Sequence, residues 1–129
     1  MPSNWKESYE TFKKAHSKLT EFVETDDNSE KDRSAIINAF QYTFELWWKT
    51  LQKYMQQQEL LEEFGPAATI RTAFHYQFID DGDAYMTMLK DRNLITHTYK
   101  EDVAKDIYEN IKNKYIELFD DFIREYDEK

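Results

Sequence analysis

A short run of residues near position 95 combines three side chains that can act on a phosphate. The run 91–99 reads DRNLITHTY, and it contains Arg92, His97 and Tyr99 within eight residues. An arginine offers a planar set of N–H donors to phosphate oxygens, and a histidine can move a proton near neutral pH. The spacing therefore predicts a phosphate-directed site, although the same residue types near a helix end can equally serve only to cap carbonyls and to cover apolar surface.

The position of this run relative to helix ends decides whether its side chains can meet. On one straight helix, residues five apart point about 140° apart, so Arg92 and His97 would diverge. Residues 98–101 have the form of a capping box, with Thr98 as N-cap and Glu101 at the third helical position. We therefore expect one helix to end near residue 96 and the next to begin at residue 99, with His97 in the corner and within reach of Arg92.

The start of that next helix should favour the same chemistry. Free backbone N–H groups at a helix N-terminus attract phosphate, and their partial positive charge disfavours an imidazolium. A neutral imidazole is what a general base requires, so the corner suits His97 for proton transfer. Tyr99 should lie in the first helical turn with its hydroxyl accessible.

Apolar residues recur at steps of three and four along most of the chain, which is the pattern of amphipathic helices. We expect helices over 5–23, 30–63 with a possible break near 56–58, 67–79, 84–96 and 100–126. Ser29 and Asp83 are the expected N-caps of the second and fourth helices, and Gly65-Pro66 should separate the second from the third. The pattern predicts an all-α protein, an antiparallel up-and-down four-helix bundle with a short additional helix, in which residues 1–129 form a single domain.

Composition narrows the function classes. The 129 residues include no cysteine, which excludes thiol catalysis, disulfides and thiolate metal sites and fits a cytoplasmic location. Neither a signal peptide nor an apolar run of the roughly 20 residues that span a bilayer is evident, so we expect no membrane association. The net charge of −9 argues against an extended nucleic-acid surface. Any RNA contact should be local or completed by a partner, and a basic protein partner is easier to explain.

The motif and its surroundings resemble a known family. Residues 92–99 match the Arg-x4-His-x-Tyr motif of HepT-type proteins in the HEPN superfamily, and the wider sequence resembles nucleotidyltransferase substrate-binding proteins. Supporting matches are residues 32–40 (DRSAIINAF), 71–74 (RTAF) and 88–93 (MLKDRN). The resemblance covers nearly the whole chain.

This resemblance implies a function for each motif residue. It implies a homodimeric RNase toxin that needs no metal or other cofactor, in which His97 is the acid/base, Arg92 stabilises the phosphate and Asn93 helps to position it. It also implies a minimal nucleotidyltransferase partner, the antitoxin, which attaches AMP to Tyr99. The added adenylate would block RNA by bulk and negative charge.

Two alternatives stay open at this level. The acidic composition and the wide aromatic stripe of residues 30–63 also suit a non-catalytic substrate-binding subunit of a nucleotidyltransferase, so whether the chain is an enzyme is undecided. A metal-binding four-helix bundle is the third possibility, but the ligand pair Glu-x-x-His that such bundles use is not found. We expect His16, on an apolar stripe, to be a core or interface residue, and Trp47 and Trp48 to serve the core and a subunit contact. The candidate metal ligands are Glu7, Glu10, Glu21, Glu45 and His16.

Overall fold

The computed structural model describes residues 4–61 and 63–129, and its regular elements are all helical. This confirms the predicted all-α class. The six α-helices of the described residues are α1 (Trp5–Glu24), α2 (Glu30–Gln57), α3 (Pro66–His75), α4 (Gly82–Asn93), α5 (Glu101–Asn110) and α6 (Ile116–Tyr126). A 3₁₀ turn, Ile95–His97, follows α4, and a π-helical segment, Ile111–Tyr115, joins α5 to α6 without a break.

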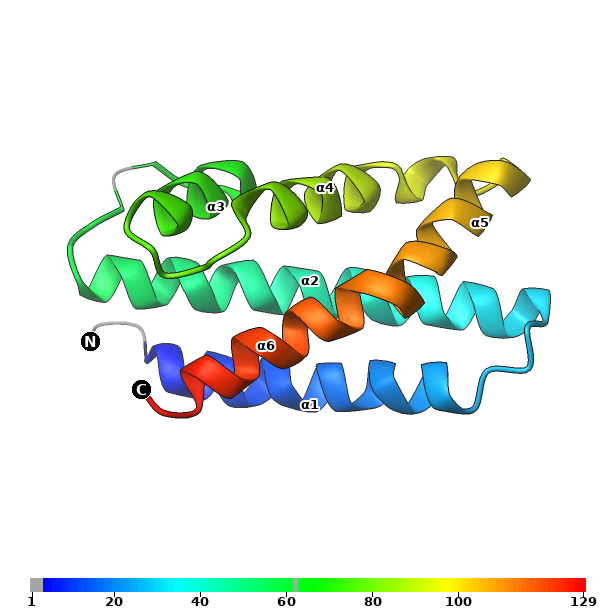
Figure 1. The fold of residues 1–129 in the computed structure, drawn as a ribbon, viewed down its shortest axis with the longest axis horizontal. Helices are drawn as coiled ribbons and strands as arrows, with labels where there is room; N and C mark the ends of the chain where they lie inside the picture. Colours follow the sequence, from blue (N-terminus) through cyan, green and yellow to red (C-terminus); the bar gives the residue numbers. More distant parts are fainter. Residues whose placement is uncertain (1–3, 62) are drawn as a thin grey trace.

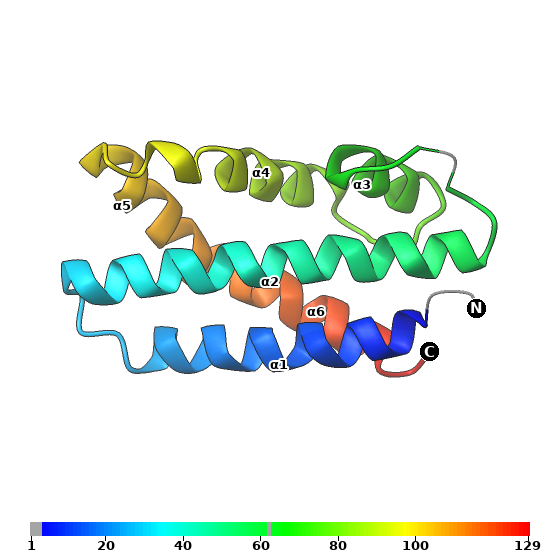
Figure 2. The same cartoon turned by 180° about the vertical axis from the view of Figure 1, so that it is seen from behind.

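The long helix α2 is the centre of the arrangement. It runs antiparallel to α1, and α3 and α4 follow one another along another side of it (Figure 1). The α5–α6 rod starts beside the end of α4 and crosses α2 obliquely toward the start of α1, as the view from behind also shows (Figure 2). The chain between α4 and α5, which carries the motif, therefore lies at the end of the bundle opposite to α3.

The core between these helices is largely aromatic. Trp47 of α2 is fully buried and stacks on Tyr85 of α4, with ring centroids 4.5 Å apart and planes 8° apart. Phe119 of α6 contacts Phe12 of α1 edge-on, at a centroid distance of 5.4 Å. Offset stacks and edge-to-face pairs add directional preference to the burial of apolar area. The ring contacts therefore determine the packing positions of α1, α4 and α6 relative to α2.

Two predicted helix ends were wrong, for one shared reason. The second helix ends at Gln57, at the possible break expected near 56–58, and does not continue to residue 63; the third ends at His75 rather than near residue 79. After each end, a non-glycine residue adopts a left-handed conformation, Glu59 at φ 58° and Gln77 at φ 63°. The next backbone N–H then turns back to a carbonyl in the last helical turn, as in a Schellman cap. Since glycine is the usual residue there, the sequence did not indicate the left-handed residues themselves, although the run 56–58 had indicated a possible break in the second helix.

The predicted N-caps were half right. Ser29 caps α2 as expected, its hydroxyl accepting a hydrogen bond of 3.0 Å from the Asp32 backbone N–H. The fourth helix begins at Gly82, two residues earlier than expected, and its cap is Asp81 rather than Asp83. In a run of acidic residues, the backbone geometry selects which carboxylate accepts the capping bond.

Individual side chains behave largely as expected. His16 is buried at 4% exposure, and its Nε2 lies 2.6 Å from the Asp120 carboxylate of α6. Trp47 is in the core, whereas Trp48 is half-buried at its edge. Within the described residues, the helices fall short of the length and apolar character that crossing a bilayer would require.

A carboxylate ties the α1–α2 loop to α5. Asp26 accepts hydrogen bonds from the Tyr108 hydroxyl and, at 3.0 Å, from the Lys112 ammonium. Burial alone would raise the pKa of Asp26, but the bonds from Tyr108, the Asn28 backbone and Lys112 outweigh it and hold the pKa below its usual value. The ionised form therefore stabilises this end of the fold.

A pH titration of stability should expose this contribution. Because the folded pKa lies below the unfolded value of about 3.9, the stabilisation is complete above about pH 4 and is lost as the pH falls through the folded pKa. We expect the parent to exceed Asp26→Asn in free energy of unfolding at pH 5–7, with the difference shrinking in acid. Urea denaturation at several pH values measures it. The exposed Asp106→Asn should show almost no difference, and a pH-independent gap for Asp26→Asn would contradict the prediction.

Candidate functional site

The motif occupies a tight corner between two helices. After α4 ends at Asn93, backbone bonds run from His97 to Leu94 at 2.9 Å and from Lys100 to His97 at 3.0 Å. Successive short turns of this kind reverse the chain within a few residues before α5 begins at Glu101. The expected corner at His97 is therefore present.

The expected capping box is wrong. The Thr98 hydroxyl donates to the Ile95 carbonyl at 2.9 Å and so closes the 3₁₀ turn instead of capping α5. Glu101 pairs across the fold with Arg33 at 2.7 Å, and α5 starts at Glu101, two residues later than expected. Tyr99 consequently lies in the connecting turn, outside the helix. The long-range ion pair competes for the glutamate that the local motif required.

His97 and Tyr99 lie together on the outside of this corner. Their ring centroids are 5.9 Å apart with planes at 61°, and the Tyr99 side chain is highly exposed, at 77%. His97 and Asn93 are exposed as well. The hydroxyl that the resemblance assigns to modification is thus accessible to another protein.

Arg92 turns toward α2 rather than toward His97. Its Nη2 donates to Glu45 of α2, and its Nη1 donates to the Asn93 amide oxygen at 3.0 Å. The guanidinium carbon also lies 5.8 Å from the centre of the Phe44 ring, within the range of a cation–π contact. The structure thus joins Arg92 to Asn93 and His97 to Tyr99, and the contacts of Arg92 do not extend to His97.

A buried carboxylate anchors the end of α4 beside Arg92. Asp91 is only 8% exposed, and its Oδ2 accepts hydrogen bonds from the Tyr115 hydroxyl and, at 2.9 Å, from the Asn110 amide. Burial and the bond to Asp91 both raise the pKa of Tyr115, so its hydroxyl stays a donor at any ordinary pH. The position of Arg92 is therefore tied to the α5–α6 rod.

The π-helical segment allows both of these hydrogen bonds to reach the same Asp91 oxygen. On an α-helix, residues 110 and 115 would point about 140° apart. The segment bonds the Ile116 N–H to the Ile111 carbonyl, a spacing of five, which brings residues five apart toward one side. Asn110 and Tyr115 can then reach the same oxygen.

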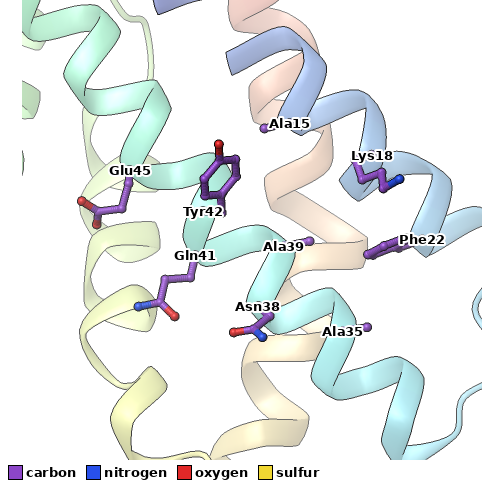
Figure 3. Close-up of a pocket in the computed structure, with 9 residues that line it drawn as sticks. All are labelled: Ala15, Lys18, Phe22, Ala35, Asn38, Ala39, Gln41, Tyr42 and Glu45. Atoms are coloured by element: carbon purple, nitrogen blue, oxygen red, sulfur yellow. The ribbon is translucent and has the colours of Figure 1, made fainter. Parts of the chain in front are cut away.

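A shallow groove of about 750 Å³ lies between α1 and α2 and reaches Glu45 (Figure 3). Small side chains of both helices form its floor, while Tyr42 stands 62% exposed on its α2 side. Because Glu45 also contacts Arg92, the groove is continuous with the motif side of α2. It is lined by Ala15, Lys18, Phe22, Ala35, Asn38, Ala39, Gln41, Tyr42 and Glu45.

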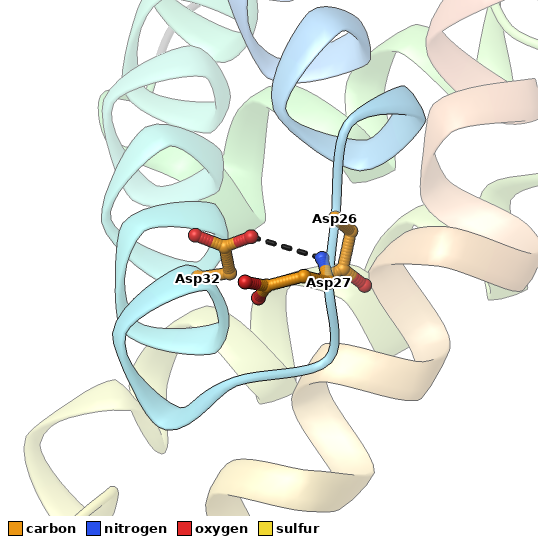
Figure 4. Close-up of side chains that lie close together, drawn as sticks. All are labelled: Asp26, Asp27 and Asp32. Carbon is orange, nitrogen blue, oxygen red and sulfur yellow. Dashed lines mark hydrogen bonds between the residues drawn. The ribbon is translucent and has the colours of Figure 1, made fainter.

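One group of three carboxylates in the described chain has the spacing of metal ligands: Asp26 and Asp27 lie in the α1–α2 loop and Asp32 lies in the first turn of α2 (Figure 4). Asp32 accepts a hydrogen bond of 2.9 Å from the Asp27 N–H, and Asp27 accepts one of 3.0 Å from the Ser29 N–H. Asp26 is engaged by Tyr108 and Lys112. Loop capping accounts for these contacts without an ion. The candidate metal ligands considered from the sequence do not form such a group among the described residues. His16 pairs with Asp120, and Glu45 pairs with Arg92.

Over residues 7–128, the sequence matches the family described as nucleotidyltransferase substrate binding protein like. The chain belongs to this family. The crystal structure of ttk003001694 from Thermus thermophilus has a similar fold, with a TM-score of 0.81 and 34% sequence identity over 88% of this chain and 97% of that chain. No curated protein matches the chain. The resemblance of the wider sequence to nucleotidyltransferase substrate-binding proteins is thereby confirmed.

Sequence reasoning missed two residues that hold Arg92 and the end of α4 in place. Glu45 was considered only as one of several helical acids, and Asp91 was treated as part of the run. Glu45 is 47 positions from its partner and Asp91 bonds residues 19 and 24 positions away. A single sequence carries no local signal for pairs this distant, although a carboxylate directly before the motif arginine could have drawn attention.

Removing the Tyr115 hydroxyl should loosen the anchor. Tyr115→Phe leaves the buried Asp91 carboxylate with one donor fewer, and we expect a loss of about 1–3 kcal/mol in the free energy of unfolding. Urea denaturation measures it. Tyr76→Phe, which removes the same hydroxyl from an exposed position, should stay within about 0.5 kcal/mol of the parent. Equal stabilities of the two variants would show that the bond contributes nothing.

Proposed function

We propose that this protein is a HEPN-type RNase toxin that cleaves RNA without a metal and is neutralised when a minimal nucleotidyltransferase adenylylates Tyr99. The observation that carries the proposal is the corner itself. Arg92, Asn93, His97 and Tyr99 all lie at one end of the bundle, and the imidazole and the phenol stand exposed beside each other. The family's described link to nucleotidyltransferases supports the same partner.

The residues suit an internal transfer at an RNA phosphate. His97 would take the proton of the ribose 2′-hydroxyl while the oxygen of that hydroxyl attacks the adjacent phosphorus. The bond from phosphorus to the 5′-oxygen would break, leaving a 2′,3′-cyclic phosphate and a 5′-hydroxyl that receives a proton. Arg92 would stabilise the charge that develops on the phosphate oxygens, with Asn93 helping to position it.

A second copy of the chain would complete the site. The exposed Tyr42 and the groove beside it present a face of α2 that is continuous with Glu45 and Arg92. A homodimer through this face would bring two motifs toward one cleft and double the number of cations available to one RNA phosphate. This would offset locally the net charge of −9 on each chain.

The nucleotidyltransferase step needs an accessible phenol. The Tyr99 oxygen would attack the α-phosphorus of ATP, lose its proton and release pyrophosphate, which leaves AMP on the ring. Since Tyr99 is the most exposed of the large apolar side chains of the described residues, an enzyme can reach it without unfolding the corner. The adenylate would then stand beside His97 and exclude RNA.

The alternative is a non-catalytic substrate-binding subunit of the nucleotidyltransferase. The ion pair of Arg92 with Glu45 favours it, because a neutralised arginine attracts phosphate less than a free one. In this case the corner would serve only as the docking or substrate element for the enzyme, within the cytoplasm.

Cleavage in the presence of a chelator tests the nuclease. We expect the purified parent to cleave bulk tRNA or mRNA in EDTA, and His97→Ala to lose roughly 10²–10⁴-fold in rate through loss of proton transfer. Arg92→Ala should be similarly impaired. His75→Ala, which removes an exposed imidazole at the far end of the bundle, is the matched control and should cleave normally. Undiminished cleavage by folded His97→Ala would refute the nuclease assignment.

Labelling with the nucleotidyltransferase tests the modification. With ATP and the cognate enzyme, the parent should gain adenylate by intact mass, and its RNA cleavage should fall in step. Tyr99→Phe lacks the nucleophilic oxygen and should stay unlabelled, while Tyr76→Phe, also an exposed tyrosine, should be labelled like the parent. Labelling of Tyr99→Phe at the parental level would place the acceptor elsewhere.

A further inference from the structure

Glu45 occupies a position that no functional assignment of the motif explains. It lies on the outer side of α2 with its side chain 28% exposed, and both of its carboxylate oxygens are engaged. Oε1 accepts from Arg92, and Oε2 accepts from the Trp48 indole N–H at 3.1 Å. Trp48, one turn along the same helix, therefore holds the glutamate that holds the arginine.

The guanidinium of Arg92 is held in one orientation but keeps N–H donors for a further acceptor. One N–H goes to Glu45, one goes to Asn93, and the Phe44 ring lies beneath the group. An arginine has five N–H donors, so three have no protein acceptor among the described residues. The contacts fix the direction of a group that still has donors to offer to an anion.

We propose that Glu45 is a positioning residue for the phosphate site, with Trp48 as its support. Glu45 acts through Arg92 and does not itself touch the substrate. This proposal rests on the proposed function, since it gives Arg92 a phosphate to hold.

A positioning carboxylate has two opposite effects on an anionic substrate. Its negative charge lowers the attraction of Arg92 for phosphate, which weakens binding. Its bond holds the guanidinium where the transition state needs it, which speeds the chemical step. An inhibitory contact would have only the first effect, and a purely structural contact would have neither.

Glu45→Gln separates these effects. The amide removes the charge and can accept from Arg92 or from Trp48, but its other side presents N–H groups and cannot serve both. With a short RNA substrate in EDTA, we expect KM to fall by roughly two- to fivefold as the charge is lost. We expect kcat to fall by about tenfold as Arg92 is positioned less well.

Trp48→Phe tests the support without changing any charge. It removes the indole N–H, frees one side of Glu45 and leaves the Arg92 ion pair able to form, so kcat should fall while KM stays at the parental value. Asp121→Asn is the charge control, because it breaks an exposed ion pair with Arg124 on α6 and should change neither parameter. A fall in KM with kcat unchanged or raised in Glu45→Gln would overturn positioning in favour of inhibition. An unchanged or raised KM would overturn the proposal altogether.

A measurement that does not need catalysis keeps the two proposals separable. In ¹⁵N spectra, Arg92→Ala should shift the Trp48 indole signal, because Glu45 loses its partner, and should leave the buried Trp5 indole signal in place. If the parent cleaves no RNA, the proposed function fails. The shift would still show that Arg92 is connected to Trp48 through the two hydrogen bonds of Glu45. If the Trp48 signal does not move, the positioning proposal fails whether or not RNA is cleaved.

Discussion

The burial of the aromatic side of α2 is the constraint on which the rest of the structure depends. Phe40, Phe44 and Trp47 are fully buried, and α1 packs along this helix while rings of α4 and α6 contact Trp47 and Phe40. Once the helical repeat sends Phe44 and Trp47 inward, it must turn Glu45 and Trp48 toward the edge. The residue that pairs with the motif arginine is thus placed by the core, and any shift of α2 that repacks its rings also moves Glu45. The position of Arg92 in the motif corner therefore depends on the packing of the hydrophobic core.

How much of this could be predicted depended on the range of the interactions involved. The helices, the Ser29 cap and the corner at His97 follow from periodicity and local hydrogen bonding, and the sequence predicted them. The left-handed ends at Glu59 and Gln77 were missed because side chains other than glycine adopt them only when the surrounding packing compensates. The capping box failed because Glu101 found Arg33, 68 residues away, a partner that exists only once the chain has folded.

The site shows the same division. The motif residues Arg92, Asn93, His97 and Tyr99 were identifiable from their spacing, but their orientation was not. The sequence suggested that Arg92 would reach His97, whereas the structure pairs it with Glu45 on a different helix. A buried or half-buried cationic side chain is stabilised by pairing with a carboxylate that it can reach without strain. In a chain with 26 acidic residues, the distance along the sequence does not indicate which carboxylate that will be.

The π-helical segment explains why a buried acid can be tolerated next to the motif. An isolated carboxylate in an apolar setting is strongly disfavoured, and Asp91 receives no cation among the described residues. Its compensation is two hydrogen bonds to one oxygen, which an ordinary α-helix could not supply from residues five apart. A π-helical turn is itself less favourable than the α-helix that it interrupts, so the wider turn and the buried acid make sense only together. Each is locally unfavourable, and jointly they fix the end of α4, one residue before the arginine that Glu45 holds from the other side.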